Sequence, residues 1–389
     1  MWIRRSAEPT LSDLARTRPV VVLTGARQTG KTSLLRHLFP GHRFVSLDLP
    51  SEAEQAEKEP REFLRRWPAP LIVDEVQYAP ELFRHLKSVV DAARDRNGQY
   101  LLTGSQRFTL MQGVTESLAG RVGLVELETL ALPEIAALAV GNATTVLTDT
   151  LWRGGFPELH ANRAIDPANF YASYISTYLE RDVRSLSAVG SLRDFERFLR
   201  ACALRSANLL NKAELARDVG IAPSTANQWL SILQASGHVI LLESWFSNRT
   251  RSIVKSPKLY FADTGLLCAL LNIQSTAVLL GSPLIGAIFE TYVFQQLRHR
   301  ERYGAGGSIW FWRDRSREVD FVVDRGGRVE LVEAKFTELP SDGDASNLRY
   351  VQQLLGDSVS RSVVACRAAN PYPLGAGVQV ESPLHWALG

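Results

Sequence analysis

The pattern of apolar and polar positions predicts an α/β fold for the first third of the chain. Short apolar runs predict strands at residues 20–24, 43–47, 71–73, 100–103 and 122–127, and amphipathic helical stretches fill the gaps. Strands that alternate with helices favour a parallel sheet that is covered on both faces and binds ligands at the carboxyl ends of its strands.

The apolar spacing becomes helical from residue 133 to about residue 200 and predicts an all-α lid. Two short helical stretches follow at residues 212–219 and 224–236, and they flank a turn at Gly220 before an apolar run at residues 238–245. This order resembles a winged helix-turn-helix.

The last third of the chain again mixes helix and strand. After a helical stretch that ends near His299, apolar runs predict strands at residues 309–312, 319–323 and 329–334. Gly326 and Gly327 predict a hairpin turn that makes the last two strands neighbours.

Composition narrows the class of protein. A chain of 389 residues with 45% hydrophobic content predicts several globular domains and excludes a disordered protein. The formal charge of only +3 means that any nucleic-acid surface must be a local patch. Only seven of the 44 basic residues are lysines, so a lysine hints that a compact ammonium is required at its position.

The cysteines and the apolar runs indicate a compartment. Cys202, Cys268 and Cys366 are far apart and lack the spacing of metal ligands, which argues against a disulfide framework or a zinc cluster. No run approaches the roughly 18 apolar residues that span a bilayer. We therefore expect a cytoplasmic protein without a membrane anchor or a secretion signal.

Residues 25–32 read GARQTGKT, a complete G-x-x-x-x-G-K-T between an apolar strand and a helix. Glycines allow backbone N–H groups to surround phosphates, the lysine reaches the terminal phosphates, and the threonine binds Mg²⁺. We expect ATP with Mg²⁺ to bind here, through Gly25, Arg27, Gln28, Thr29, Gly30, Lys31, Thr32 and Ser33.

A second carboxylate-bearing strand completes the predicted nucleotide site. Residues 71–75 read LIVDE, so Asp74 is expected to hold Mg²⁺ with Thr32, and Glu75 to polarise the attacking water. The strand at residues 100–103 ends beside them, and Ser105 is the first choice for a sensor of the γ-phosphate. Thr103 and Gln106 are nearly equal alternatives.

The chain resembles bacterial AAA+-type ATPases in which a P-loop module precedes a C-terminal region of unassigned role. The resemblance spans nearly the whole chain, in the segments GARQTGKT, LIVDEVQ, LLTGSQ, LAGRV, RGGFPE, YLERDV, KLYFADTGLL, GAIFETYV and FWRDRSREVDFVV. It implies that Arg121 is an arginine finger acting across a subunit boundary, that Arg153 contacts nucleotide from the lid, and that the chain forms a homo-oligomer, expected to be a hexameric ring. A solvated surface arginine is the alternative for Arg121.

Charged residues interrupt the apolar C-terminal strands. Glu318 and Asp320 share one face of a strand, as do Glu333 and Lys335 on the next, and buried charges need a partner or a metal. The pattern resembles the PD-(D/E)xK nuclease core, which implies that Asp320 and Glu333 bind Mg²⁺, that Lys335 positions water and that Glu290 contributes from the preceding helix. The alternative is an ion-pair cluster that cleaves nothing.

A cluster of cations marks the expected wing. Residues 245–258 carry Arg249, Arg251, Lys255 and Lys258 beside two aromatic residues, a composition typical of contacts with the DNA backbone. A protein-binding wing, or one packed on a neighbouring subunit, is the alternative.

Four domains follow from these patterns: a P-loop AAA+-like core at residues 1–130, a helical lid at 131–200, a winged helix at 201–265 and a restriction-endonuclease-like α/β domain at 266–389. We expect an ATP-hydrolysing motor or switch that acts on DNA and possesses a nuclease-like domain. The rival is a nucleotide-dependent regulatory or scaffold protein whose C-terminal domain binds protein.

Overall fold

The computed structural model describes residues 2–105, 117–138, 143–179, 192–245, 256–314 and 316–387. The chain divides into two compact units, one formed by Met1–Thr129 with Ala235–Gly237 and the other by Leu130–Gln234 with His238–Gly389. The predicted end of the P-loop core at residue 130 lies beside this division. The further boundaries at residues 200 and 265 stay a prediction.

The first unit is built on a five-stranded parallel sheet in the order β2-β3-β4-β1-β5. Its strands are β1 (Val20–Thr24), β2 (Arg43–Ser46), β3 (Leu71–Asp74), β4 (Tyr100–Gly104) and β5 (Val122–Glu126). Since β1, β3 and β4 are buried along their whole length, their apolar runs are continuous rather than alternating. The predicted α/β fold with a parallel sheet is confirmed for this unit.

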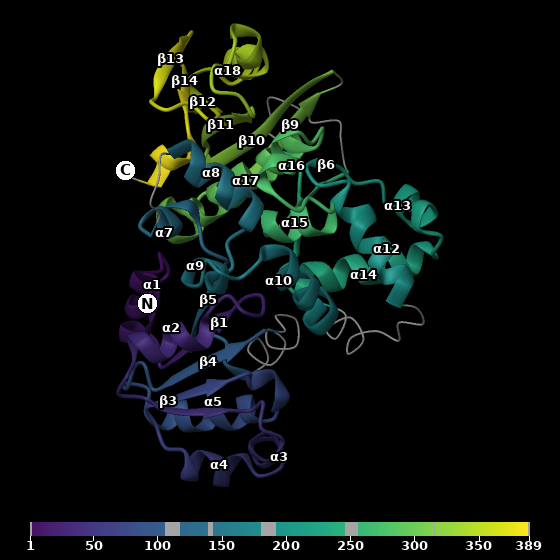
Figure 1. Cartoon of the computed structure of the whole chain (residues 1–389). Helices are drawn as coiled ribbons and strands as arrows, with labels where there is room; N and C mark the ends of the chain where they lie inside the picture. The colour runs from purple at the N-terminus through teal and green to yellow at the C-terminus, as the bar shows by residue number, and fades with distance from the viewer. Residues whose placement is uncertain are drawn as a thin grey trace. The chain divides into compact units, whose positions relative to one another are not determined.

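Helices cover both faces of this sheet (Figure 1). One face carries α1 (Glu8–Thr17) and α2 (Lys31–Leu38), and the other carries α3 (Pro50–Lys58), α4 (Pro60–Arg66) and α5 (Leu82–Ala92). The apolar side chains of α5 and of the 3₁₀ turn η1 (Val76–Tyr78) pack against the β1 and β3 residues that point to their side. This packing holds the carboxyl ends of the strands at one edge, where the P-loop follows β1.

The second unit begins with helices and a small antiparallel sheet in the order β6-β8-β7. The helices are α7 (Leu132–Ala136), α8 (Ala143–Arg153), α9 (Pro157–Ala161), α10 (Pro167–Tyr174), the π-helical turn η2 (Ile175–Leu179), α12 (Leu192–Ala203), α13 (Lys212–Val219) and α14 (Pro223–Ala235). The strands are β6 (Asn208–Leu209), β7 (Val239–Leu242) and β8 (Lys258–Phe261), followed by α15 (Thr264–Leu270) and α16 (Thr276–Leu280).

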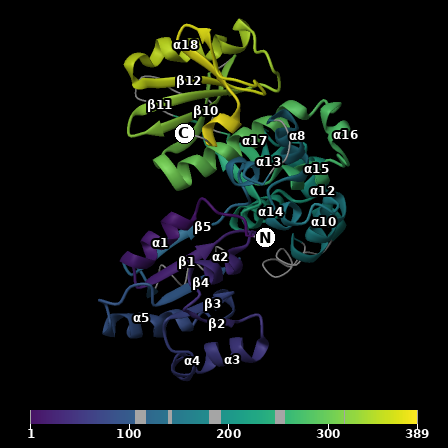
Figure 2. The same ribbon diagram turned by 60° about the vertical axis from the view of Figure 1, so that its left-hand side comes forward.

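A mixed six-stranded sheet ends the chain, in the order β13-β14-β12-β11-β10-β9. Its strands are β9 (Ser308–Asp314), β10 (Arg317–Arg325), β11 (Arg328–Ala334), β12 (Val359–Ala365), β13 (Tyr372–Gly375) and β14 (Val378–Glu381). Figure 2 shows the sheet between α17 (Ile285–Arg300) and α18 (Ser346–Leu355). The turns η3 (Glu301–Ala305), η4 (Asp342–Ala345), η5 (Gly356–Ser358) and η6 (Pro383–Ala387) complete this part.

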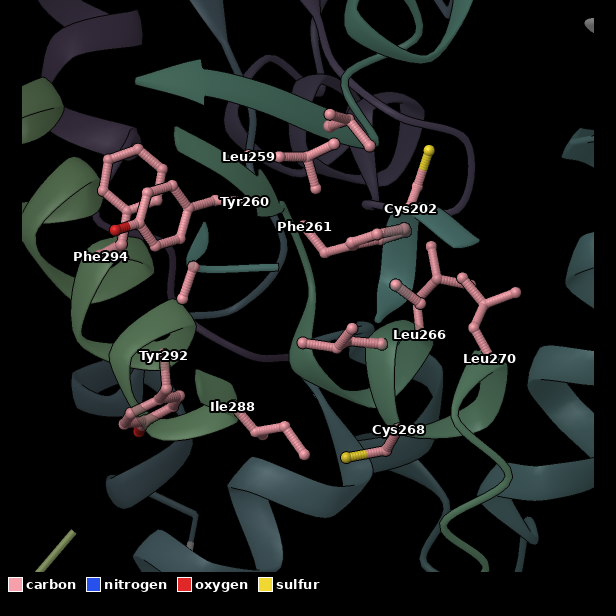
Figure 3. Close-up of a cluster of buried hydrophobic side chains, with 14 of the residues drawn as sticks. Cys202, Leu259, Tyr260, Phe261, Leu266, Cys268, Leu270, Ile288, Tyr292 and Phe294 are labelled. Carbon is pink, nitrogen blue, oxygen red and sulfur yellow. The ribbon is translucent and has the colours of Figure 1, made fainter. Parts of the chain in front are cut away.

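One apolar core joins the helices of the second unit to the C-terminal sheet. Alternation along β8 directs neighbouring side chains to opposite sides. Figure 3 shows Tyr260 beside Phe294 of α17, with ring centroids 4.4 Å apart, whereas Phe261 extends away from them towards Cys202. The face of β8 that carries Tyr260 therefore belongs with α17, and this becomes important for Lys258, two residues earlier.

Candidate functional site

The P-loop leaves β1 at Gly25 and enters α2 at Lys31. Gly25 has φ +144°, and a Cβ there would lie 2.2 Å from the Leu127 carbonyl oxygen, so only glycine fits. Gly30 precedes α2 in the left-handed region, with φ 91°. The two motif glycines thus serve the backbone path that brings N–H groups to the amino end of the helix.

Lys31 is buried, and its Nζ donates to the carbonyl oxygens of Gly25 and Ala26 at 3.0 and 2.9 Å. The ammonium thus lies inside the curve of the loop, where phosphate binding requires a cation. Gln28 adopts a positive φ of 61° within the same loop, and Thr29 Oγ1 donates to the Ala26 carbonyl at 3.0 Å. Ser33 is exposed on the first turn of α2.

Arg5 holds the loop from behind and was not expected from the sequence. Its side chain is buried, and its Nη1 and Nη2 donate to the carbonyl oxygens of Thr29 and Glu128 at 2.8 and 2.7 Å. Arg5 therefore ties the P-loop to the segment after β5. The only local signal was an arginine next to the apolar Ile3 and Ala7.

Asp74 ends β3 between two hydroxyl groups. Its Oδ1 accepts a hydrogen bond from Thr32 Oγ1 at 2.6 Å and another from Thr103 Oγ1. The two oxygens predicted to contact Mg²⁺ are thus adjacent, and the binding of Mg²⁺ by Thr32 and Asp74 stays a prediction. Hard oxygen donors of this kind suit Mg²⁺.

Glu75 follows Asp74 with a left-handed backbone, φ 54°, which is unusual for a residue with a side chain. Its Oε2 accepts hydrogen bonds from Ser105 Oγ at 3.1 Å and from Gln77 Nε2. Burial raises the pKa of Glu75, but the charge of Lys31, the Gln77 hydrogen bond and the charge of Arg27 outweigh burial and hold it below its ordinary value. The carboxylate is therefore ionised at neutral pH.

Ser105 contacts the Glu75 carboxylate, and Thr103 contacts both Asp74 and the Glu75 backbone N–H; which residue senses the γ-phosphate stays a prediction. Gln106 lies outside the described residues. Gln77 is a further site residue that was not predicted; its position two residues after Glu75, at the end of LIVDEVQ, was the available signal.

Arg121 lies at the opposite edge of the sheet from the P-loop. It precedes β5, whose Val122 pairs with Val20 at the start of β1, whereas Gly25 follows the end of β1. Its guanidinium donates to both carboxylate oxygens of Asp91 in α5, at 2.7 and 3.0 Å. Arg121 therefore cannot serve the P-loop of its own chain, and its action in another chain stays a prediction.

Arg153 ends α8 in the second unit, and its Nη1 donates to the Ile165 carbonyl at 3.2 Å. The motif around it is tightly packed, since Tyr171 Oη donates to the Arg153 carbonyl at 2.9 Å and to Asp263 Oδ1 at 2.8 Å. The backbone N–H of Gly155 donates to the other Asp263 oxygen at 2.8 Å. The segments RGGFPE and KLYFADTGLL are thus joined by hydrogen bonds, directly and through Tyr171. The contact of Arg153 with nucleotide stays a prediction.

The hairpin of β10 and β11 brings the predicted C-terminal residues together with α17. Asp320 Oδ2 accepts from the backbone N–H of Ala334 at 2.9 Å, and Glu333 Oε1 accepts from Lys335 Nζ at 2.8 Å. Burial, followed by the charge of Asp320, raises the pKa of Glu333 to about 8 and that of Glu290 to about 7. Asp320 and Glu333 thus lie on neighbouring strands, as the strand periodicity predicted, while Glu290 comes from α17; the roles of these residues stay a prediction.

Lys258 is also part of this cluster, and the prediction that it contacts DNA from the wing is wrong. Its side chain is only 2% exposed, and its Nζ lies 2.9 Å from Glu290 Oε1 and forms an ion pair with Glu318. Burial lowers the pKa of this ammonium, but the charges of Glu290, Asp320 and Glu318 outweigh burial and raise it. A buried, paired ammonium cannot reach a phosphate.

The cluster does not fit the Mg²⁺ that the nuclease resemblance implies. An ammonium lies among the carboxylates, and within the described ranges no group of three or more His, Cys, Asp or Glu side chains is arranged to hold a metal ion. The remaining wing cations, Arg249, Arg251 and Lys255, lie outside the described residues.

Three family models match successive parts of the chain. An AAA domain matches residues 17–136, a domain of unknown function (DUF8612) matches residues 144–277, and another (DUF4143) matches residues 285–385. The AAA match includes the P-loop and all five strands of the parallel sheet. Within the part of the chain that the structure describes, no helix has the length and apolar character to cross a membrane.

Two mycobacterial proteins are similar to most of the chain. Uncharacterized protein Rv2008c of Mycobacterium tuberculosis and uncharacterized protein Mb2031c of Mycobacterium bovis are each 34% identical over 342 residues, which is 87% of this chain and 75% of each relative. Among solved structures, the Walker-type ATPase paby2304 of Pyrococcus abyssi is 16% identical, with a TM-score of 0.48 over 70% of this chain and 96% of that one. The chain therefore belongs to the family of these mycobacterial proteins, and its first unit is an AAA-type P-loop ATPase domain.

Proposed function

We propose that the chain hydrolyses ATP at the P-loop and couples this reaction to the binding of DNA by the α12–α14 segment. The observation that carries the ATPase assignment is the joint placement of Thr32, Asp74, Glu75 and Ser105 at the carboxyl edge of the parallel sheet. The phosphates of ATP would bind at the amino end of α2. Lys31 would then exchange its hydrogen bonds with the loop carbonyls for contacts with the phosphates.

Glu75 performs the proton chemistry in this proposal. Its carboxylate is ionised and held by Ser105 and Gln77, so it can orient a water molecule and polarise its O–H bond. The water oxygen bonds to the γ-phosphorus while the bond to the bridging oxygen breaks; ADP leaves with the electron pair of that bond, and Glu75 accepts the proton that the water loses. Thr32 and Asp74 would hold Mg²⁺, which neutralises charge on the phosphates when bound.

The DNA part of the proposal rests on the helices α12, α13 and α14 and on the β6-β8-β7 sheet, an arrangement that supports the winged helix-turn-helix interpretation. The exposed face of α14 carries uncharged polar side chains: Ser224, Asn227, Gln228, Ser231 and Gln234. Asn and Gln amides can pair with adenine edges in a major groove. No acidic residue of α14 opposes the approach of phosphate.

The discriminating experiment is an ATPase assay with single-stranded, duplex and branched DNA. DNA that raises the turnover several-fold supports the coupled ATPase. An ATPase that ignores every DNA form, in a protein that binds none of them, would support the scaffold alternative instead.

The wing prediction can be tested without the buried lysine. A triple Arg249→Ala, Arg251→Ala, Lys255→Ala variant should bind all duplexes more weakly, and the slope of log affinity against log salt should fall by about one unit for each cation that contacts phosphate. An Asn227→Ala, Gln228→Ala variant should instead change sequence preference and leave the salt slope alone. Unaltered DNA affinity in both variants would exclude this surface.

Assembly into a ring is part of the same proposal. Arg121→Ala should abolish hydrolysis with nearly unchanged ATP affinity, whereas Asp91→Ala breaks the same ion pair and should retain activity. Mixing Arg121→Ala with Lys31→Ala protein should restore some turnover through mixed interfaces. A fully active monomer at the assay concentration would contradict action in trans, and the mass of the assembly would report whether the ring is hexameric.

Metal-dependent cleavage by Asp320, Glu333 and Lys335 is not included in this proposal, since the cluster does not fit a metal. Incubation of the same DNA forms with Mg²⁺ or Mn²⁺ tests this exclusion directly. Cleavage that is lost in Asp320→Asn, with the ATPase intact, would reinstate the nuclease.

A further inference from the structure

Lys258 is the centre of the C-terminal carboxylate cluster. Its Nζ lies 2.9 Å from Glu290 Oε1, forms an ion pair with Glu318 Oε1 and lies 3.6 Å from Asp320 Oδ1. These carboxylates come from α17 and from two same-face positions of β10. One ammonium thus lies among three carboxylates supplied by two elements.

Each of these carboxylates also accepts a hydrogen bond from a second group. Tyr260 Oη donates to Glu290 Oε1 at 2.6 Å, Arg313 Nη1 donates to Glu318 Oε2 at 3.0 Å, and the Ala334 backbone N–H donates to Asp320 Oδ2 at 2.9 Å. Each of the three carboxylates is therefore held by Lys258 and by one further group of the chain.

Apolar and aromatic groups enclose the ammonium. The Phe311 ring centroid lies 5.8 Å from Lys258 Nζ, and Tyr260, two residues along β8, packs on Phe294 and Phe321. In such surroundings two or three carboxylates without a cation would be strongly destabilising, because each buried charge would lack compensation. The lysine ammonium supplies that positive charge as a compact point charge. The guanidinium of an arginine is planar and spreads its charge over a larger group.

Glu333, on the strand next to that of Asp320, has one carboxylate oxygen without a hydrogen-bond partner in the part of the chain that the structure describes. Its Oε1 accepts from Lys335, but its Oε2 is buried without a hydrogen-bond partner among the described residues. Glu333 lies on the strand next to that of Asp320, so this oxygen belongs to the same group of carboxylates. The carboxylates therefore have the composition of a divalent-cation site, with an ammonium among them.

We infer that the ammonium of Lys258 takes the place of a divalent metal among Glu290, Glu318 and Asp320, so that the C-terminal centre is a metal-independent ion cluster. Replacement of Lys258 by a neutral residue converts this centre into a site for a hard divalent cation. This inference is independent of the ATPase and of DNA binding, because neither involves Lys258.

Mn²⁺ is the probe, measured by the loss of the free-ion signal in electron paramagnetic resonance. The full chain is used without nucleotide and in an Asp74→Asn background, so that the P-loop carboxylate does not contribute. The variants are the background alone, Lys258→Met, and Lys335→Met as a matched control, since Lys335 is also paired with a cluster carboxylate but is 35% exposed.

Lys258→Met should bind one more Mn²⁺ per chain than the background, and millimolar Mn²⁺ should raise its melting temperature by about 5 °C or more. The background and Lys335→Met should bind no additional ion and melt as they do in EDTA. Stoichiometric Mn²⁺ binding by the background, abolished by Glu290→Gln, would overturn the inference. So would a Lys258→Met protein that folds as stably as Lys335→Met and binds no Mn²⁺.

If Lys258→Met does not fold without metal, a second variant tests the inference. Lys258→Met with Glu290→Gln removes one positive and one negative charge together, so it should fold in EDTA and bind Mn²⁺ at least tenfold more weakly than Lys258→Met refolded with Mn²⁺. Equal folding defects in the double and single variants, with no rescue of either by Mn²⁺, would contradict the substitution of ammonium for metal.

Discussion

The P-loop edge and the C-terminal cluster contain the same residue types in opposite states. Each brings carboxylates together with a lysine beside them: the P-loop carboxylates lie at the end of one strand, whereas those of the cluster come from α17, β10 and β11. At the P-loop, Asp74 and Glu75 accept hydrogen bonds from hydroxyl and amide groups, and Lys31 is held by backbone carbonyls. In the C-terminal cluster, Lys258 and Lys335 pair directly with the carboxylates.

Burial and nearby charge shift the pKa of a carboxylate in opposite directions in the two regions. Glu75 keeps a pKa below its ordinary value, whereas burial raises that of Glu333 to about 8. A metal ion or water can replace a neutral hydroxyl donor without leaving a buried charge unpaired. Displacement of a buried ammonium from its carboxylate would leave the ammonium without a partner. Two carboxylates and a lysine are therefore typical of a catalytic site only when the lysine does not form an ion pair with those carboxylates, as at the P-loop, where Lys31 is bonded to backbone carbonyls.

The largest expected effect is on ATP turnover. Glu75→Gln should lower kcat by about 10² to 10⁴-fold, because general base catalysis contributes a factor of this size, with little change in ATP affinity. Steady-state kinetics and equilibrium nucleotide binding measure the two quantities. Lys31→Ala is the contrasting variant, which should lose affinity; full turnover by Glu75→Gln would remove this residue from water activation.

The next effect breaks the C-terminal cluster. In EDTA at pH 8, Lys258→Met should lower the free energy of unfolding by about 3–5 kcal/mol, since removal of one partner leaves buried charge uncompensated. Lys335→Met should cost about 1 kcal/mol or less because its ion pair is partly exposed. Urea denaturation followed by tryptophan fluorescence measures both; similar losses would show that burial of the ammonium is unimportant.

A smaller effect concerns pH. Because the folded pKa of Glu333 is about 8 and that of an unfolded glutamate is 4.5, the folded state holds its proton more tightly, and stability should fall as pH rises through this interval. Each unit of pKa difference corresponds to about 1.4 kcal/mol as an upper bound. Glu333→Gln should flatten this slope in urea titrations at successive pH values, whereas Glu62→Gln, on an exposed helix, should leave it unchanged.

The smallest expected effect is on ATP affinity and concerns Arg5, which holds the P-loop. Arg5→Met should weaken ATP binding by about tenfold, because two charge-assisted hydrogen bonds to the carbonyls of Thr29 and Glu128 are lost. Calorimetric titration with a non-hydrolysable ATP analogue measures this. Arg4→Met is the neighbouring control and should bind as the wild type does, so equal losses in both variants would assign the effect to the terminal segment as a whole.

Local pattern was sufficient where the chemistry is local. The motif of residues 25–32 and the run of residues 71–75 gave the strands, the loop and its carboxylates, and period-two alternation brought Asp320 and Glu333 together. Lys258 was misplaced because it follows Arg249, Arg251 and Lys255 in sequence, while its partner Glu290 lies 32 residues further along the chain, in α17. Its place before the apolar run Leu259–Phe261 was the overlooked signal, since residues 258 and 260 share a strand face.

The sheet of the first unit also constrains how copies of this chain could share a nucleotide. The P-loop lies at its carboxyl edge and Arg121 at its amino edge, so one copy would present Arg121 to the P-loop of the next. Such contacts are heterologous: two different surfaces meet, and a two-fold dimer cannot satisfy both. An assembly of this kind has a direction, and it ends with one unused arginine and one incomplete site unless the rotation between neighbours closes.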